Sequence, residues 1–400
     1  MLRVGLLLLL LFLGPRAHAR TWGVPVAIED PGHVGLGHWY AALRATGTGG
    51  VARALHYGDS TIAADGIART VRARLQARFG DAGPGFVTAA FDPAWNQRSD
   101  VANVRRGDWA LRTILFGGAD GRYGLGGIVG IARTGASVSL HALDATGAAR
   151  AVRHLEVWHQ AGVGYGDLVV SGDGAELTRA SGAAPETDDR KLVFDLPLGV
   201  TEVKLASAGG PVPVYGVVLE TGDPGVTWES LGVIGVGARS FTRYAGPRLA
   251  EQVALRDPDL LVVMLGGNEA GYPILGVNQG RGYVPIYTAA LDVIRTGAPE
   301  ASCLVVSPLD QGYLDEETGE ARARPGMANL VAAQRVAAQT RGCAFWSAWA
   351  AMGGVGSALA WTASPGLSTG DLVHLTTRGV DVIGGLLADA ILQDYDGWAG

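Results

Sequence analysis

The chain has 400 residues, of which 48% are hydrophobic and 18% charged, and its formal net charge at pH 7 is −6. This length and composition indicate a folded protein with one large or two medium domains. The acidic balance and the absence of a Lys/Arg-rich run argue against a nucleic-acid partner. The 61 glycines follow no fixed period, which excludes a collagen-like chain.

The N-terminus has the features of a secretory signal. Arg3 precedes the apolar run VGLLLLLLFL at residues 4–13, which is short for a membrane span. Gly14 ends the run, and Ala17-His18-Ala19 has the small-x-small form that signal peptidase cleaves. We therefore predict a signal peptide at 1–19 and a periplasmic or secreted protein, with an uncleaved membrane anchor as the alternative.

The first part of the mature chain, 20–104, predicts the start of an α/β domain. A short helix is expected at 39–45, and VARALHYG at 51–58 is typical of a buried strand. Gly80 then ends a predicted amphipathic helix. The apolar positions of this helix recur every four residues: Ile67, Val71, Leu75 and Phe79.

The sequence pattern changes at 105–222, where short segments typical of β-strands alternate with clusters of Gly, Asp and Ser. We predict an inserted antiparallel β-sandwich for this block. At 223–400 an α/β rhythm returns, with LGVIGVGA from residue 231 and DLLVVMLGG at 259–267 as strands. Further strands are expected at CLVVSP and CAFWSA, and helices at 285–297, 326–340 and 377–393. Alternating strands and helices predict a parallel sheet covered on both faces.

The two cysteines leave their pairing open. Cys303 and Cys343 each begin a predicted buried strand. If the strands are neighbours, a disulfide fits an exported chain, but two buried free thiols fit equally well. No second Cys or His stands at ligand spacing, so neither a metal nor another cofactor is expected.

Three polar signatures follow predicted strands or precede the last helix, where ligands of parallel sheets collect. Ser60 in GDS is the candidate nucleophile and His374 the candidate base. Asp371, three residues before His374, reaches the imidazole if the segment turns helically. Backbone N–H groups of Ser60 and Gly237 and the Asn268 amide are the candidate oxyanion donors. Ser60 is also expected at the N-terminus of the helix that follows.

Each of these residues also has a purely structural interpretation. Ser60 or its neighbour Asp59 can cap a helix, Asn268 suits a turn, and Gly237 permits a tight bend. His374 alone is more often structural than catalytic. Their order and complementary roles favour a hydrolytic site, in which Asp59 is structural.

Four short blocks resemble the SGNH, or GDSL-type, hydrolase superfamily. Ser60 stands in HYGDST, Gly237 in GVGAR, Asn268 in GGNEA, and Asp371 with His374 in DLVHLT. The resemblance covers roughly 50–100 and 228–393, and it implies a flavodoxin-like three-layer α/β/α fold. Two positions depart from the family pattern: Thr61 replaces Leu in GDSL, and Glu269 replaces Asp in GxND. Neither change removes a catalytic group.

GDS with GxNE, the β insertion and WAAMGGVGSALAW at 349–361 are similar to one subgroup of this family. That subgroup includes exported esterases and acetyltransferases that act on O-acetyl groups of peptidoglycan or exopolysaccharide. The resemblance thus implies a serine esterase for an acetylated polysaccharide. The alternatives are an O-acetyltransferase working with a membrane acyltransferase partner, and a non-catalytic glycan-binding protein. By analogy, 105–222 is expected to resemble a carbohydrate-binding module.

Overall fold

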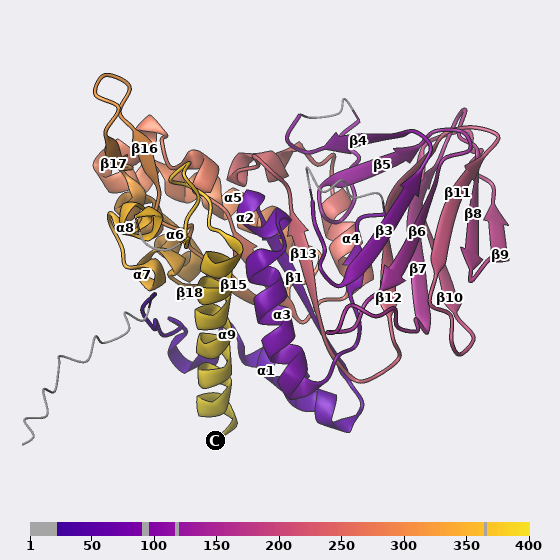
Figure 1. The fold of residues 1–400 in the computed structure, drawn as a ribbon, viewed down its shortest axis with the longest axis horizontal. Coiled ribbons are helices and arrows are strands. Elements are labelled where there is room, and N and C mark those ends of the chain that lie inside the picture. Colours follow the sequence, from indigo (N-terminus) through magenta and orange to yellow (C-terminus); the bar gives the residue numbers. More distant parts are fainter. Residues whose placement is uncertain (1–21, 90–95, 117–119, 364–365) are drawn as a thin grey trace, which may run out of the picture.

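The computed structural model describes residues 22–89, 96–116, 120–363 and 366–400 (Figure 1). The signal peptide predicted at 1–19 lies outside these residues. Figure 1 shows an α/β body with a β-sandwich packed beside it. Within the described ranges, no helix has the length and apolar character required to traverse a bilayer.

A five-stranded sheet, parallel throughout, forms the centre of the body. If its strands are numbered along the chain, their spatial order is 2-1-3-4-5, which is the flavodoxin-like order. The predicted fold class is therefore confirmed. From one edge to the other the strands are β13 (Gly225–Gly232), β1 (Val51–Gly58), β14 (Leu260–Met264), β15 (Ser302–Val306) and β18 (Ala344–Trp346).

Helices cover both faces of this sheet because its strands are apolar on both sides. Leu261 and Val263 of β14 pack into one core, whereas Val262 packs into the other. The first core is closed by α4 (Arg248–Arg256), α5 (Val284–Arg295) and α6 (Met327–Thr340). The second is closed by α1 (Gly37–Ala45), α3 (Gly66–Phe79) and α9 (Thr377–Ala399).

Short elements connect these layers. The short α-helices are α2 (Ser60–Ala63), α7 (Ala348–Met352) and α8 (Ser357–Thr362). A hairpin of β16 (Gly312–Leu314) and β17 (Ala321–Ala323) projects from the body at the upper left of Figure 1. The 3₁₀ turns are η1 (Pro31–His33), η2 (Thr46–Thr48), η3 (Ala238–Arg243), η4 (Gly267–Glu269), η5 (Pro273–Gly276) and η6 (Asn278–Tyr283).

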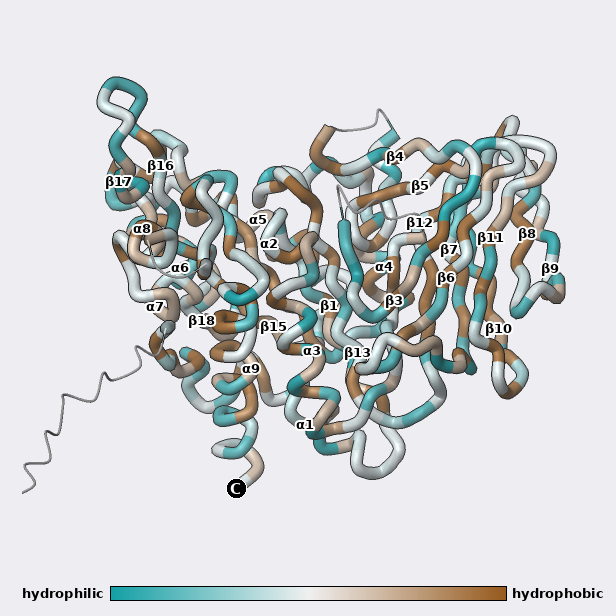
Figure 2. The backbone as a smooth tube through the Cα atoms, viewed as in Figure 1, coloured by the Kyte–Doolittle hydropathy of each residue, from teal (hydrophilic) through white to brown (hydrophobic). Residues whose placement is uncertain are grey.

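Two antiparallel sheets form the sandwich. The sheet nearer the body contains β10 (Asp188–Asp195), β7 (His154–Ala161), β12 (Val212–Glu220), β5 (Ile128–Ala132) and β4 (Trp109–Thr113), and β2 (Gly85–Val87) pairs with β12. The outer sheet contains β3 (Val101–Arg106), β6 (Ser137–Ala142), β11 (Val203–Ala208), β8 (Asp167–Gly172) and β9 (Ala175–Ala180). Hydrophobic and polar residues alternate along β6 (Figure 2), as expected for a strand with one face in a core. β7 is buried on both faces, because it lies between the sandwich core and the core that the sandwich shares with the body. The boundaries 105 and 222 stay a prediction.

Apolar packing and buried ion pairs join the sandwich to the body. Phe86 and Trp158 of the inner sheet share a core with Leu55 of β1. Beside them, Glu220 of β12 accepts hydrogen bonds from Arg256 (2.8 Å) and Arg53 (3.0 Å). Leaving one partner of such a buried pair unmatched typically costs about 3 to 5 kcal/mol, so these contacts fix how the two parts sit together.

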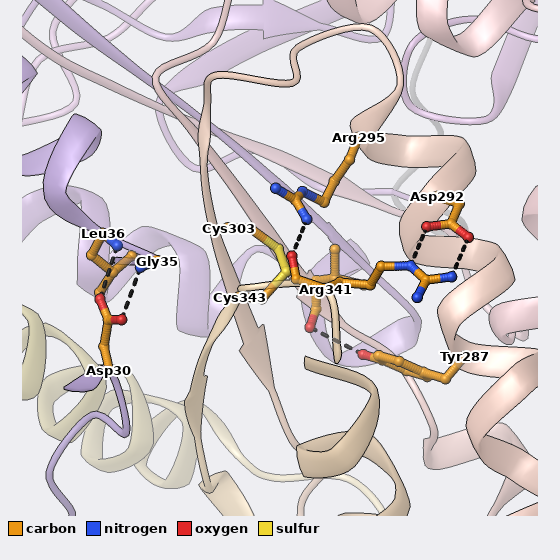
Figure 3. The surroundings of a disulfide bond; sticks show 10 residues. Asp30, Gly35, Leu36, Tyr287, Asp292, Arg295, Cys303, Arg341 and Cys343 are labelled. Atoms are coloured by element: carbon orange, nitrogen blue, oxygen red, sulfur yellow. Dashed lines mark hydrogen bonds and ion pairs between the residues drawn. A yellow bond between two sulfur atoms is a disulfide. The ribbon is translucent and has the colours of Figure 1, made fainter. Parts of the chain in front are cut away.

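Cys303 and Cys343 form a disulfide, which resolves the alternative that the sequence left open. The bond joins β15 to the residue that precedes β18 (Figure 3). The N-terminal segment runs past the same place, where the Cys303 N–H donates to the Gly35 carbonyl at 3.0 Å. Figure 3 also shows Asp30 accepting hydrogen bonds from the N–H groups of Gly35 and Leu36, at 2.8 and 2.9 Å.

Two elements differ from the expectations. The strand expected from residue 231 is β13, which begins at Gly225 and contains the buried Glu229. The helix expected directly after β1 is broken, because Asp65 adopts a left-handed conformation (φ 59°) between α2 and α3. Ser60 therefore begins a single helical turn and not the long amphipathic helix.

Candidate active site

Two chain segments place polar groups at the carboxyl edge of the sheet, where β1 and β14 lie side by side. Ser60 follows β1, and Asn268 follows β14. In the flavodoxin-like order this is the switch point, where ligands bind. Gly58 is required at the corner, because a Cβ there would collide with Ile62. Asp59 caps the turn, since its Oδ1 accepts a hydrogen bond from the Thr61 N–H at 3.0 Å.

Ser60, His374 and Asp371 form a hydrogen-bonded chain. Ser60 Oγ lies 2.9 Å from His374 Nε2, and His374 Nδ1 lies 2.6 Å from Asp371 Oδ2. The ionised carboxylate accepts the Nδ1 proton, which leaves the Nε2 lone pair to accept the serine proton. The three residues predicted as a triad thus stand in the arrangement that nucleophilic catalysis needs.

A tight turn, and not the expected helical turn, brings Asp371 to the imidazole. Leu372 is in the left-handed region (φ 63°), and Asp371 Oδ1 accepts the N–H groups of Val373 and His374, both at 2.9 Å. Partial burial would raise the pKa of Asp371. Hydrogen bonds from the His374 backbone and the Thr369 hydroxyl outweigh burial and hold that pKa well below its usual range. Asp371 therefore stays ionised and orients the imidazole at neutral pH.

Of the candidate oxyanion donors, Asn268 is available to a substrate, whereas the Gly237 N–H is already hydrogen-bonded within the protein. The Asn268 side-chain amide donates to the Val236 carbonyl at 2.8 Å, so one of its two hydrogens fixes the group and the other remains for substrate. The Gly237 N–H donates to Ser240 Oγ at 3.2 Å. Gly235 (φ 81°), and not Gly237, lines the cavity next to Ser60. The structure thus brings Ser60, His374 and Asn268 together and places Gly237 one step behind them.

A small cavity of about 140 Å³ opens beside Ser60. This volume is well below the roughly 300 to 1,000 Å³ of pockets for drug-sized ligands. Its apolar lining consists of Ile234, Met264, Pro308, Leu309 and Val373. The cavity therefore suits a short acyl group.

Sequence reasoning missed Gln311, which lines this cavity and donates from Nε2 to the Gly267 carbonyl at 3.0 Å. In the sequence it stands in PLDQG, in the loop that follows β15, where no recognisable motif marks it. The site is open to solvent at the base: the side chain of His374, which also lines the cavity, is 45% exposed, and that of Asp371 is 50% exposed. A bulky alcohol can thus approach the leaving-group side.

We expect Asn268→Ala to lower kcat by about 10² to 10³-fold, because one oxyanion donor contributes roughly this much. Steady-state kinetics on a chromogenic acetyl ester measure the loss, and KM should change little. Asn268→Asp keeps the shape but replaces the donor with a negative charge, so its loss should be at least as large. Full activity in either folded variant would exclude Asn268 as a donor.

The comparisons with known proteins agree with this geometry. Residues 207–382 match the GDSL-like lipase/acylhydrolase family, which confirms the resemblance inferred from the four blocks. The match includes Asn268, Asp371 and His374, whereas Ser60 precedes it. No curated protein sequence matches the chain.

Among solved structures, one of a peptidoglycan O-acetylesterase superposes with a TM-score of 0.76 and 22% identity, covering 92% of this chain and 99% of that one. This likeness establishes the shared fold, sandwich included. An acetylxylan esterase from Geobacillus stearothermophilus gives a TM-score of 0.30 and 20% identity, covering 43% of this chain and 73% of that one.

Proposed function

We propose that this chain, which carries a GDSL-like lipase/acylhydrolase domain, is an exported serine esterase that removes O-acetyl groups from an extracellular or cell-wall polysaccharide. The observation that carries the proposal is a small cavity beside Ser60 whose lining includes His374, an imidazole that is also partly exposed to solvent. The cavity accepts a short acyl group, and the exposure of His374 leaves room for the sugar of a polymer at the leaving-group position.

The reaction follows from the hydrogen-bonded chain. His374 Nε2 takes the proton of Ser60 as the hydroxyl oxygen attacks the ester carbonyl carbon. The Asn268 amide stabilises the resulting oxyanion, and Asp371 stabilises the imidazolium. The protonated His374 then gives its proton to the departing sugar oxygen, which leaves an acetyl group on Ser60. Water, deprotonated by His374, attacks this ester and releases acetate.

Two further features support this proposal. The exposure of His374 favours hydrolysis over transfer to a second sugar, because bulk water reaches the acyl-enzyme easily. The Cys303–Cys343 disulfide suits an oxidising compartment, in line with export. Glycan binding does not require the hydrogen-bonded chain of Ser60, His374 and Asp371, so this chain favours an enzyme over a protein that only binds glycan.

Acetate release from acetylated peptidoglycan and acetylated xylan tests the function. We expect free acetate from at least one polymer, faster hydrolysis of acetyl than of butyryl chromogenic esters, and no dependence on added sugar. Acetyl transfer to an added acceptor in place of acetate release would establish the acetyltransferase alternative. Release of neither product, with retained binding to the polymer, would indicate a glycan-binding protein.

A further inference from the structure

A buried carboxyl group, Glu269, lies directly behind the candidate oxyanion turn. Its side chain is 1% exposed and does not line the cavity. Glu269 Oε1 accepts hydrogen bonds from the Ala238 N–H at 2.5 Å and from the Tyr283 hydroxyl at 3.0 Å. A Cβ at Gly237 would collide with this carboxyl, so glycine is required there. Glu269 therefore sets the position of the 235–238 turn.

The surroundings of Glu269 disfavour its ionised form. Oε2 is buried and has no hydrogen-bond partner among the described residues, and within the same ranges no Lys, Arg or His forms an ion pair with the carboxyl. Its titratable neighbours are Asp59, from the corner after β1, with Tyr283 from η6 and Tyr287 from α5. Burial raises the pKa of Glu269 to about 7, against the lowering effect of the Ala238 N–H and the Tyr283 hydroxyl, and Asp59 raises it further.

We propose that Glu269 is a positioning residue of the esterase, which as a neutral acid holds the turn beside the oxyanion and which slows acyl transfer when it ionises. The proposal rests on the function proposed above. The Asn268 amide is fixed by the Val236 carbonyl, and Glu269 contacts the next two residues of the same turn, Gly237 and Ala238, so its negative charge would lie close to the group that binds the oxyanion. An ionised Glu269 and the oxyanion would both be negative, and like charges repel each other strongly in a buried site, which opposes the transition state.

Glu269→Gln tests the proposal, because the amide keeps an acceptor for the Ala238 N–H and cannot ionise. In the wild type, kcat on an acetyl ester should fall about tenfold as the pH rises through about 7. In Glu269→Gln this fall should disappear, with kcat near the wild-type value at pH 6. Glu251→Gln, an exposed change on α4, serves as the matched control and should keep the wild-type profile.

Tyr283→Phe provides a second, independent test, because it should shift the pH at which kcat falls. The Tyr283 hydroxyl stabilises the carboxylate, so its removal should raise the pKa of Glu269 and move the fall in kcat to higher pH. A purely structural role of Glu269 would lower activity equally at all pH values in both variants. That result would overturn the proposal.

Thermal unfolding tests the ionisation of Glu269 independently of enzyme activity. The pKa of Glu269 is about 7 in the folded protein, above its ordinary value of 4.5, so the folded protein binds this proton more tightly than the unfolded chain does. The stabilisation is complete below about pH 4.5 and is lost as the pH rises through about 7. The Tm of Glu269→Gln relative to wild type should therefore rise by roughly a few degrees between pH 5 and 8.

The outcomes separate the two proposals. If the wild type shows no esterase activity, the proposed function fails, and the Tm difference alone reports the state of Glu269. If the wild type is active and Ser60→Ala is not, an unchanged pH profile in Glu269→Gln overturns only the role of Glu269. A Tm difference that is constant with pH overturns it as well.

Discussion

Ser60→Ala should lower kcat on an acetyl ester by about 10⁴ to 10⁶-fold, because the variant has no hydroxyl to form the acyl-enzyme. The cavity, the Asn268 amide and the imidazole stay in place, so KM should change little. The residual rate comes from oxyanion binding and proximity alone. Steady-state kinetics with a sensitive fluorogenic acetate measure the loss.

Ser181→Ala is the matched control, since Ser181 is exposed in the sandwich. This variant should keep the wild-type rate. The Tm of Ser60→Ala should stay near that of the wild type, because Ser60 is only half-buried. A Ser60→Ala enzyme that retains more than a few per cent of its activity would contradict the assignment of the nucleophile.

His374→Ala is expected to have a similar effect, a loss of about 10⁴-fold or more in kcat, because the base that accepts the Ser60 proton is missing. The ring is half-exposed, so its removal leaves a space that solvent can reach. Added imidazole should enter this space and restore part of the activity in a concentration-dependent way. His38→Ala, at an exposed histidine of α1, controls for nonspecific effects.

Rescue by imidazole separates a missing base from a misfolded site. The Leu372 turn is held by backbone groups and by Asp371, which His374→Ala leaves in place. A His374→Ala variant with wild-type kcat, or one whose loss parallels a large drop in Tm without any rescue, would count against His374 as the base.

The strands that are apolar on both faces could be predicted from the sequence. LLVVM of β14 and CLVV of β15 are continuous hydrophobic runs, and the structure buries every residue of both strands. β13 was harder to place, because Thr227, Glu229 and Ser230 interrupt its apolar pattern. Glu229 is buried there only because Arg256, from a distant helix, pairs with it. A local sequence pattern cannot reveal an ion-pair partner that lies on a distant helix.

The candidate site residues could be chosen from their order along the chain, but their local geometry could not be predicted. The left-handed Leu372 replaces the helical turn expected between Asp371 and His374, and it follows from the hydrogen bonds of the Asp371 carboxylate. The break at Asp65 is stabilised by a buried ion pair with Arg72, seven residues later. Gln311 was missed because a glutamine after a strand has no signature of its own.

The pairing of the cysteines illustrates the same limit. Cys303 and Cys343 stand at the starts of two strands, and the sequence could not say whether those strands are neighbours. In the folded sheet β15 and β18 are adjacent and parallel, which brings the two residues together. Sheet order therefore decided between a disulfide and two thiols.

Covalent labelling with an organophosphate ester tests the central claim most directly, because the reagent reacts with a serine hydroxyl only when a base activates it and donors hold the oxyanion. Mass spectrometry of the intact and digested protein counts the adducts and locates them. We predict one adduct per wild-type chain, on Ser60, and slow or absent labelling in His374→Ala. An unlabelled wild type, an adduct on another serine, or equally fast labelling without His374 would contradict the account.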